Sequence, residues 1–136
     1  MNRFARKFLD KFFRSPYIYG PKKRFTKGKG CGLANTIFNT RSGKITLGNN
    51  VIFGHNVMVL TGYHDLKTKG DRRKTLTEAE RNIVIHANAY IGSGSIIIGP
   101  AEIGENAVVG AGSIVQGTIP PDAMITGEKA KIRKFL

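Results

Sequence analysis

The sequence predicts an all-β protein, a β-helix built from six-residue repeats, with a short helix before it and a loop inserted into it. Two series of residues support this prediction. An aliphatic residue recurs at every sixth position, at Ile85, Ile91, Ile97, Ile103, Val109 and Val115, and four residues later come Ala89, Ser95, Ala101, Ala107, Ser113 and Ile119. Each face of a triangular coil needs one inward aliphatic residue and one small corner residue, and a fixed period of this kind is typical of a solenoid.

Residues 1–30 differ from the repeats in composition. They contain ten of the 22 Lys and Arg residues and one acidic residue, Asp10, in a chain of formal net charge +13. In a helical projection the apolar residues fall on one half and most basic residues on the other: Phe4, Ala5, Phe8, Leu9, Phe12 and Phe13 against Arg3, Lys7, Lys11 and Arg14. We expect an amphipathic helix that ends before Pro16, and then a basic, flexible connection over residues 22–30.

Three roles for this basic helix are open. The favoured expectation is that its Phe side packs on the open end of the solenoid, which would otherwise expose strand edges. Residues 1–14 can instead rest on an anionic membrane surface. A pI near 10.3 is compatible with nonspecific binding of nucleic acid. No nucleic-acid recognition motif is present, so no specific nucleic-acid partner is expected.

The β-helix is expected to span residues 31–136. A less regular coil over residues 31–46, with Ile37 and Ile45 as candidate inward residues, precedes the period, which is first clear at Leu47, Phe53 and Val59. A chain of this length forms one small solenoid, whose faces are candidates for contacts between copies.

The period is interrupted once. Val59 and Ile85 are 26 residues apart, two more than four repeats, and the segment between them is polar, charged and aperiodic. A long loop inside a compact repeat domain is usually functional or disordered, so we expect an inserted loop over residues 65–82 that projects from one corner. Its Lys and Arg residues can attract an anionic substrate.

The sequence contains few features that indicate a cellular compartment. No apolar run is long enough to span a bilayer, no signal peptide is recognised, and Cys31 is the single cysteine. We therefore expect a cytoplasmic protein, peripheral to the membrane if residues 1–14 dock there.

Three segments resemble the hexapeptide-repeat acyltransferases: residues 88–93 (NAYIGS), 103–115 (IGENAVVGAGSIV) and 119–121 (IPP). The resemblance covers roughly residues 35–133 and is nearest to the maltose/galactoside O-acetyltransferases and the sugar acetyltransferases of polysaccharide gene clusters. It implies a left-handed parallel β-helix and a homotrimer with acetyl-CoA between neighbouring coils. It also implies transfer of an acetyl group to a sugar or sugar-nucleotide acceptor. We expect direct transfer, because the reaction requires no covalent enzyme intermediate and Cys31 has no obvious base beside it in the sequence.

The resemblance implies site residues on the acceptor side. Residues 61–64 (TGYH) match the segment that ends in the catalytic histidine, so His64 is the expected general base. Histidine suits this task because an imidazole accepts a proton near neutral pH. Asn39 resembles the asparagine that lines the acceptor site, and Asp65 follows His64 directly, where it could orient or charge-tune the ring.

The resemblance also implies residues that hold acetyl-CoA. Tyr90 stands where the family usually has tryptophan, and Ser93, Gly110 and Ala111 match positions along the pantetheine arm. A phosphate-binding lysine is replaced by Gly117, and a proline near the CoA tail is missing. The candidates that could compensate are Lys129, Lys131 and Arg133.

Three other functions are considered. The same base and groove could serve N-acetylation of an amino sugar or a nucleotide-linked amino sugar. A degenerate solenoid could also be a non-catalytic assembly module. A trimeric zinc lyase of the γ-carbonic anhydrase kind needs three convergent imidazoles, and the spacings between His55, His64 and His86 do not match its pattern. No metal is therefore expected.

Overall fold

The computed structural model of the protein describes residues 2–76, 80–129 and 131. Within them the chain forms one α-helix, two short 3-10 helices and twelve strands. In order these are α1 (Arg3–Arg14), β1 (Tyr17–Tyr19), η1 (Lys22–Arg24), β2 (Phe25–Lys27), β3 (Ile37–Asn39), β4 (Ile45–Leu47), β5 (Ile52–Phe53), β6 (Met58–Leu60), η2 (Gly70–Lys74), β7 (Ile83–Ile85), β8 (Tyr90–Ile91), β9 (Ile96–Ile103), β10 (Val108–Val109), β11 (Ile114–Ile119) and β12 (Met124–Ile125). The expected β-helix is confirmed.

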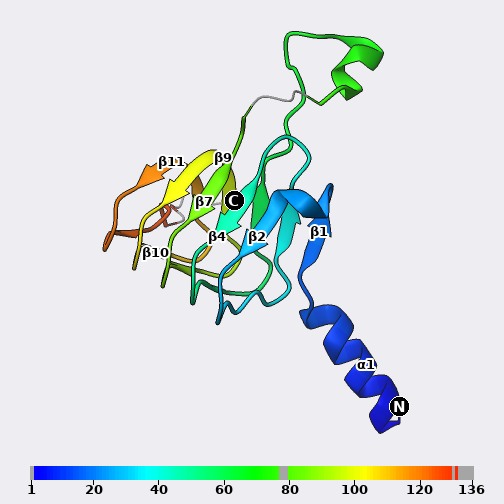
Figure 1. Ribbon diagram of the computed structural model, residues 1–136, viewed down its shortest axis with the longest axis vertical. Helices are drawn as coiled ribbons and strands as arrows, with labels where there is room; N and C mark the ends of the chain where they lie inside the picture. The colour runs from blue at the N-terminus through cyan, green and yellow to red at the C-terminus, as the bar shows by residue number, and fades with distance from the viewer. Residues whose placement is uncertain (1, 77–79, 130, 132–136) are drawn as a thin grey trace.

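All paired strands are parallel, and they form three stacked faces (Figure 1). One face runs β1-β3-β6-β9 and a second runs β2-β4-β7-β9, since the two halves of β9 pair with β6 and β7. The third face is β5-β8-β10-β12. Tyr90 pairs with Val108, 18 positions on, whereas Ile52 pairs with Tyr90, 38 positions on. The inserted loop therefore adds 20 residues to one coil.

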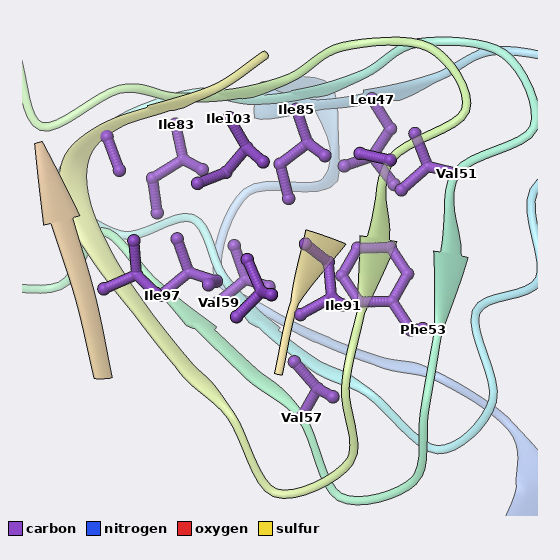
Figure 2. Close-up of a cluster of buried hydrophobic side chains, with 14 of the residues drawn as sticks. Leu47, Val51, Phe53, Val57, Val59, Ile83, Ile85, Ile91, Ile97 and Ile103 are labelled. Atoms are coloured by element: carbon purple, nitrogen blue, oxygen red, sulfur yellow. The ribbon is translucent and has the colours of Figure 1, made fainter. Parts of the chain in front are cut away.

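The core is the column of inward side chains from the successive coils (Figure 2). The inward series expected from the period is buried throughout, at Leu47, Phe53, Val59, Ile85, Ile91, Ile97, Ile103, Val109 and Val115. The expectation for Ile37 is wrong, because this side chain is 40% exposed and Phe38 is fully buried. Phe38 pairs with the inward Val59, and neighbouring residues of a strand point to opposite faces, so Ile37 points outward.

One corner of the coils carries a ladder of side-chain amides. Asn50, Asn88, Asn106 and Asp122 all adopt positive φ angles, from 57 to 61°. Each asparagine Nδ2 donates to the Oδ1 of the residue in the next coil, at 3.3, 3.2 and 2.9 Å. Asparagine and aspartate tolerate this left-handed conformation better than most other residues, so the turn and the ladder select the same residue types.

The basic N-terminal segment differs from the expectation. Residues 22–30 are not a separate connection, because η1 and β2 lie within them and β2 pairs with β4, while β1 pairs with β3. These strands occupy the end of the solenoid that α1 was expected to cap. Phe4 and Phe8 on α1 are 81% and 62% exposed, and the helix projects away from the coils (Figure 1). The expected capping of the solenoid by the Phe side of α1 is therefore wrong.

Candidate active site

The segment that leads to His64 is fixed to the preceding coil. Thr61 is buried, and its hydroxyl donates to the carbonyl oxygen of Asn39 at 2.7 Å and accepts from the backbone N–H of Ser42 at 3.2 Å. The N–H of Tyr63 donates to the Ser42 hydroxyl at 3.2 Å. These contacts give the chain a defined direction where it leaves β6 and enters the inserted loop.

The His64 ring is exposed and is oriented by the loop itself. Its Nδ1 lies 2.7 Å from the backbone carbonyl oxygen of Arg73, and His64 forms an antiparallel bridge with Leu76. A carbonyl oxygen can only accept, so Nδ1 carries the hydrogen in this contact. In the neutral ring Nε2 then has the free lone pair, which is the form that a general base requires.

A pocket of about 450 Å³ lies beside this ring. It is lined by His64, Leu66, Gly70, Arg73 and Lys74, so His64 and the inserted loop that follows it supply all of its described walls. Lys74 also forms an ion pair of 2.8 Å with Asp71. The pocket combines a proton acceptor with basic side chains, which suits a hydroxyl-bearing molecule that carries negative charge.

Asn39 and Asp65 have different surroundings. Asn39 ends β3, and its side chain packs against Gly62, where an added Cβ would lie 2.6 Å from Asn39 Nδ2. Asn39 is thus adjacent to the segment that carries His64. The Asp65 carboxylate accepts from the N–H of Lys67 at 2.9 Å and thereby stabilises the turn after His64.

Sequence reasoning did not identify Arg81, which ties the two ends of the loop together. Its guanidinium carbon lies 4.3 Å from the centre of the Tyr63 ring, and its Nη2 donates to the carbonyl oxygen of Gly99. An added Cβ on Gly43 would lie 2.6 Å from the carbonyl carbon of Arg81, so its backbone is closely packed as well. The one feature of the sequence that could have pointed to Arg81 was its position just before the six-residue period resumes at Ile85.

The residues expected to hold the pantetheine arm gather at one corner. Gly112 N donates to the carbonyl oxygen of Ser93 at 2.9 Å, and an added Cβ on Gly92 would lie 2.5 Å from Ala111 N. Gly110 adjoins Ala111 there, and its carbonyl oxygen accepts from the Ser113 hydroxyl at 2.6 Å. Tyr90 is 43% exposed on β8, the strand that leads to this corner.

Within one chain this corner and His64 lie at opposite ends of a face. The corner precedes β6 and β9, whereas His64 follows the far end of β6. At about 3.3 Å per residue, the two groups are therefore separated by at least the length of a face. The structure therefore brings the acceptor-side residues together and the CoA-side residues together, but not the two groups with each other.

The remaining expected residues lie at or near the C-terminal end. Lys129 is exposed, and Lys131 forms an ion pair of 3.1 Å with Glu128. Gly127 N donates to the Ser113 hydroxyl at 3.0 Å, which attaches this segment to the last coil. Arg133 lies outside the described residues.

The other two histidines lie away from the His64 pocket. The backbone N–H of His55 donates to the Ser93 hydroxyl at 3.0 Å, and His86 Nε2 lies 2.8 Å from a carboxylate oxygen of Glu102. Over the part of the chain that the structure describes, no group of three or more His, Cys, Asp or Glu residues is arranged to hold a metal ion.

Residues 82–117 match the family described as bacterial transferase hexapeptide (six repeats). They run from the residue before β7 into β11 and include six of the inward aliphatic positions. This part of the chain is built of the hexapeptide repeats of that family. The matched residues contain Tyr90, Ser93, Gly110 and Ala111, and they begin after the inserted loop.

Two relatives extend the similarity beyond the matched repeats. A Schizosaccharomyces pombe protein named provisionally as an acetyltransferase is 43% identical over 92 residues, which are 67% of this chain and 44% of that protein. The galactoside O-acetyltransferase of Lactococcus lactis is 33% identical over 90 residues, 66% of this chain and 42% of that protein. The aligned part thus spans less than half the length of these relatives.

Three solved structures share the fold. A maltose O-acetyltransferase from Clostridium difficile is 26% identical with a TM-score of 0.56, over 92% of this chain and 81% of that one. A hexapeptide-repeat acetyltransferase from Vibrio cholerae, solved with acetyl coenzyme A, is 23% identical with a TM-score of 0.65, over 98% and 78%. An N-acyltransferase from Bacillus cereus, solved with dTDP and coenzyme A, is 22% identical with a TM-score of 0.56, over 87% and 77%.

Proposed function

We propose that the protein is an acetyltransferase that moves an acetyl group from acetyl-CoA to a hydroxyl of a sugar or polysaccharide precursor, with His64 as the general base. The observation that carries this proposal is the hydrogen bond from His64 Nδ1 to Arg73 O, which leaves Nε2 free beside a pocket. The similarity to a galactoside O-acetyltransferase supports the reaction and the acceptor class.

The transfer needs no covalent enzyme intermediate. His64 Nε2 accepts the proton of the acceptor hydroxyl while that oxygen attacks the acetyl carbonyl carbon. A C–O bond forms, the C–S bond breaks, and the departing sulfur takes the proton from Nε2, which regenerates the neutral ring. The Arg73 carbonyl holds Nδ1–H throughout and stabilises the charge that the ring carries between these two proton transfers.

We assign acceptor binding to Asn39 and to the loop. The Asn39 side chain lies beside Gly62, and the pocket walls contribute Arg73 and Lys74. Asp65 acts on the acceptor side by fixing the turn that follows His64. Basic side chains around a proton acceptor favour an acceptor that carries phosphate, such as a sugar nucleotide.

We assign the binding of acetyl-CoA to the corner formed by Ser93, Gly110 and Ala111, with Tyr90 on the adjoining face. The small side chains of this corner fit a long, narrow pantetheine arm, because they leave backbone groups within reach. Lys129, Lys131 and Arg133 are the proposed partners of the CoA phosphates.

The complete site is proposed to lie between copies of the chain. Because His64 and the CoA corner of one chain lie at opposite ends of a face, the corner of a neighbouring copy would face His64 in a homotrimer. Mixed oligomers test this arrangement. Chains that carry His64→Ala would be mixed with chains substituted at Ser93. The mixed oligomers should regain activity if each active site is formed by residues of two chains.

An acceptor panel tests the proposed reaction. The protein would be incubated with acetyl-CoA and sugars, amino sugars or nucleotide sugars, and the release of free CoA measured. Release with hydroxyl acceptors supports O-acetylation, whereas release confined to amino sugars would replace it with N-acetylation. Failure of the intact protein to bind acetyl-CoA would contradict the proposal and favour a structural module.

A further inference from the structure

Helix α1 presents an apolar side that nothing in the described part of the chain covers. Phe4, Phe8 and Leu9 are 81%, 62% and 37% exposed. The helix is nevertheless well specified, since Asn2 caps it by accepting from the N–H of Ala5 at 2.8 Å. Large apolar side chains grouped on one face of a helix usually mark a surface that binds something.

The opposite side of α1 is strongly basic. Arg3, Arg6, Lys7, Lys11 and Arg14 lie on this helix, and Asp10 is its single acidic residue. Lys11 and Arg14 stand in the last turn. A helix of about 18 Å with aromatic residues on one side and lysine and arginine on the other has the pattern of helices that lie in the plane of a membrane surface.

The first coil is also rich in exposed basic and aromatic side chains. Lys22, Lys23, Lys27 and Lys29 are exposed there, and the aromatic residues Tyr17 and Tyr19 are 60% and 44% exposed. A groove of about 530 Å³ runs between α1 and β1, lined by Phe8, Lys11, Ser15, Pro16 and Tyr17. An apolar groove with a lysine at its edge suits a lipid, because the lipid offers an acyl chain beside a phosphate.

We propose that α1 docks on an anionic lipid bilayer, with Phe4 and Phe8 in the boundary between headgroups and acyl chains and its basic residues against lipid phosphates. The charge of residues 1–30 complements an anionic surface. A nucleic acid would pair its phosphates with the basic side of α1 but leave the aromatic side in water. A second copy would cover the aromatic side but bring like charges together. A bilayer satisfies both sides of the helix.

Docking in this way leaves the candidate active site accessible. The inserted loop that carries the His64 pocket and helix α1 lie at opposite ends of the molecule (Figure 1). A bilayer beneath α1 therefore does not block the pocket. The proposal does not depend on the acetyltransferase reaction, since its readout is binding alone.

Vesicle sedimentation with the full-length protein tests the proposal. Vesicles of phosphatidylcholine containing about a third phosphatidylserine would be compared with pure phosphatidylcholine vesicles, at low and physiological salt. We expect binding to the anionic vesicles only, and weaker binding as salt rises. Equal binding to both vesicle types, or none to either, would overturn the proposal.

Two paired variants separate the contributions. Phe4→Gln with Phe8→Gln should reduce vesicle binding by more than tenfold, because two apolar insertions are lost while the charge of the helix is unchanged. Arg6→Glu with Lys7→Glu should reduce it by about a hundredfold or more. Lys67→Glu with Lys69→Glu is the matched control, since it makes the same change of charge on exposed loop residues and should bind as the unaltered protein does.

Three further outcomes would contradict the proposal. The first is vesicle binding by the Phe4→Gln, Phe8→Gln variant equal to that of the unaltered protein. The second is a change in oligomeric state in that variant when the unaltered protein binds no vesicles, which would assign the apolar side to a second copy. The third is binding to duplex DNA but not to vesicles. Thermal unfolding of each variant checks that the solenoid is unchanged.

Discussion

The His64 ring donates a hydrogen bond from Nδ1 to the backbone carbonyl oxygen of Arg73, 2.7 Å away. The two residues are nine positions apart, and Arg73 lies in the inserted loop, which has no repeat pattern. This contact therefore gives the loop a role in deciding which ring nitrogen carries the hydrogen. A backbone acceptor has the advantage that no side-chain substitution at Arg73 removes it. The contact also links the shape of the loop to the direction in which Nε2 points.

Arg81 is predicted to position the loop rather than to take part in the reaction. Arg81→Ala removes the contact with the Tyr63 ring and the hydrogen bond to Gly99 O, so the segment before His64 loses one of its supports. We expect kcat to fall by about tenfold while KM for acetyl-CoA stays unchanged. Steady-state kinetics measure this split. Arg72→Ala, on the exposed η2, is the matched control, and an equal loss in both variants would argue against the role.

Gly62→Ala is predicted to disturb acceptor binding through Asn39. The new Cβ would lie 2.6 Å from Asn39 Nδ2, so the amide must move. We expect kcat/KM for the acceptor to fall by about tenfold to a hundredfold. The double variant Gly62→Ala with Asn39→Ala should be little worse than Asn39→Ala alone. Fully additive losses would mean that the glycine acts independently of Asn39.

Phe38→Ala and Ile37→Ala are predicted to differ widely in stability. Phe38 is fully buried, with its ring 4.7 Å from that of Phe25 and 5.4 Å from that of Phe53, whereas Ile37 points outward. We expect the free energy of unfolding to fall by about 3–5 kcal/mol for Phe38→Ala. For Ile37→Ala the loss should be about 1 kcal/mol or less. Urea unfolding measures both free energies. A larger loss for Ile37→Ala than for Phe38→Ala would contradict the assignment of Phe38 as the inward residue.

The sequence predicts the regular coils well because each inward position there repeats at a fixed interval. The six inward residues of the series from Ile85 to Val115 are buried as expected, and the phase slip between Val59 and Ile85 locates the loop. Before Leu47 the period is not sustained. Whether Ile37 or Phe38 points into the core is decided there by the pairing of β3 with β6, which cannot be predicted from the local sequence.

Two other features are inaccessible to pattern reasoning for physical reasons. β1 and β2 are three residues long each and lie in the basic N-terminal segment, and Ile18 and Phe25 are the residues in them that pack against the core. The composition of that segment therefore gives no sign that it belongs to the sheet. The contact of His64 with Arg73 depends on the fold of an aperiodic loop. The resemblance pointed to His64 itself, and its role, like those of Asn39 and the CoA-side residues, stays a prediction.

The most direct test of the proposed mechanism is the turnover of His64→Ala compared with that of His86→Ala. Removing a general base costs about 10²–10⁴-fold in rate, so we expect kcat for His64→Ala to fall in that range. His86 lies away from the pocket, beside Glu102, and its replacement should leave kcat within about twofold of the unaltered protein. A His64→Ala protein with full turnover would contradict the account.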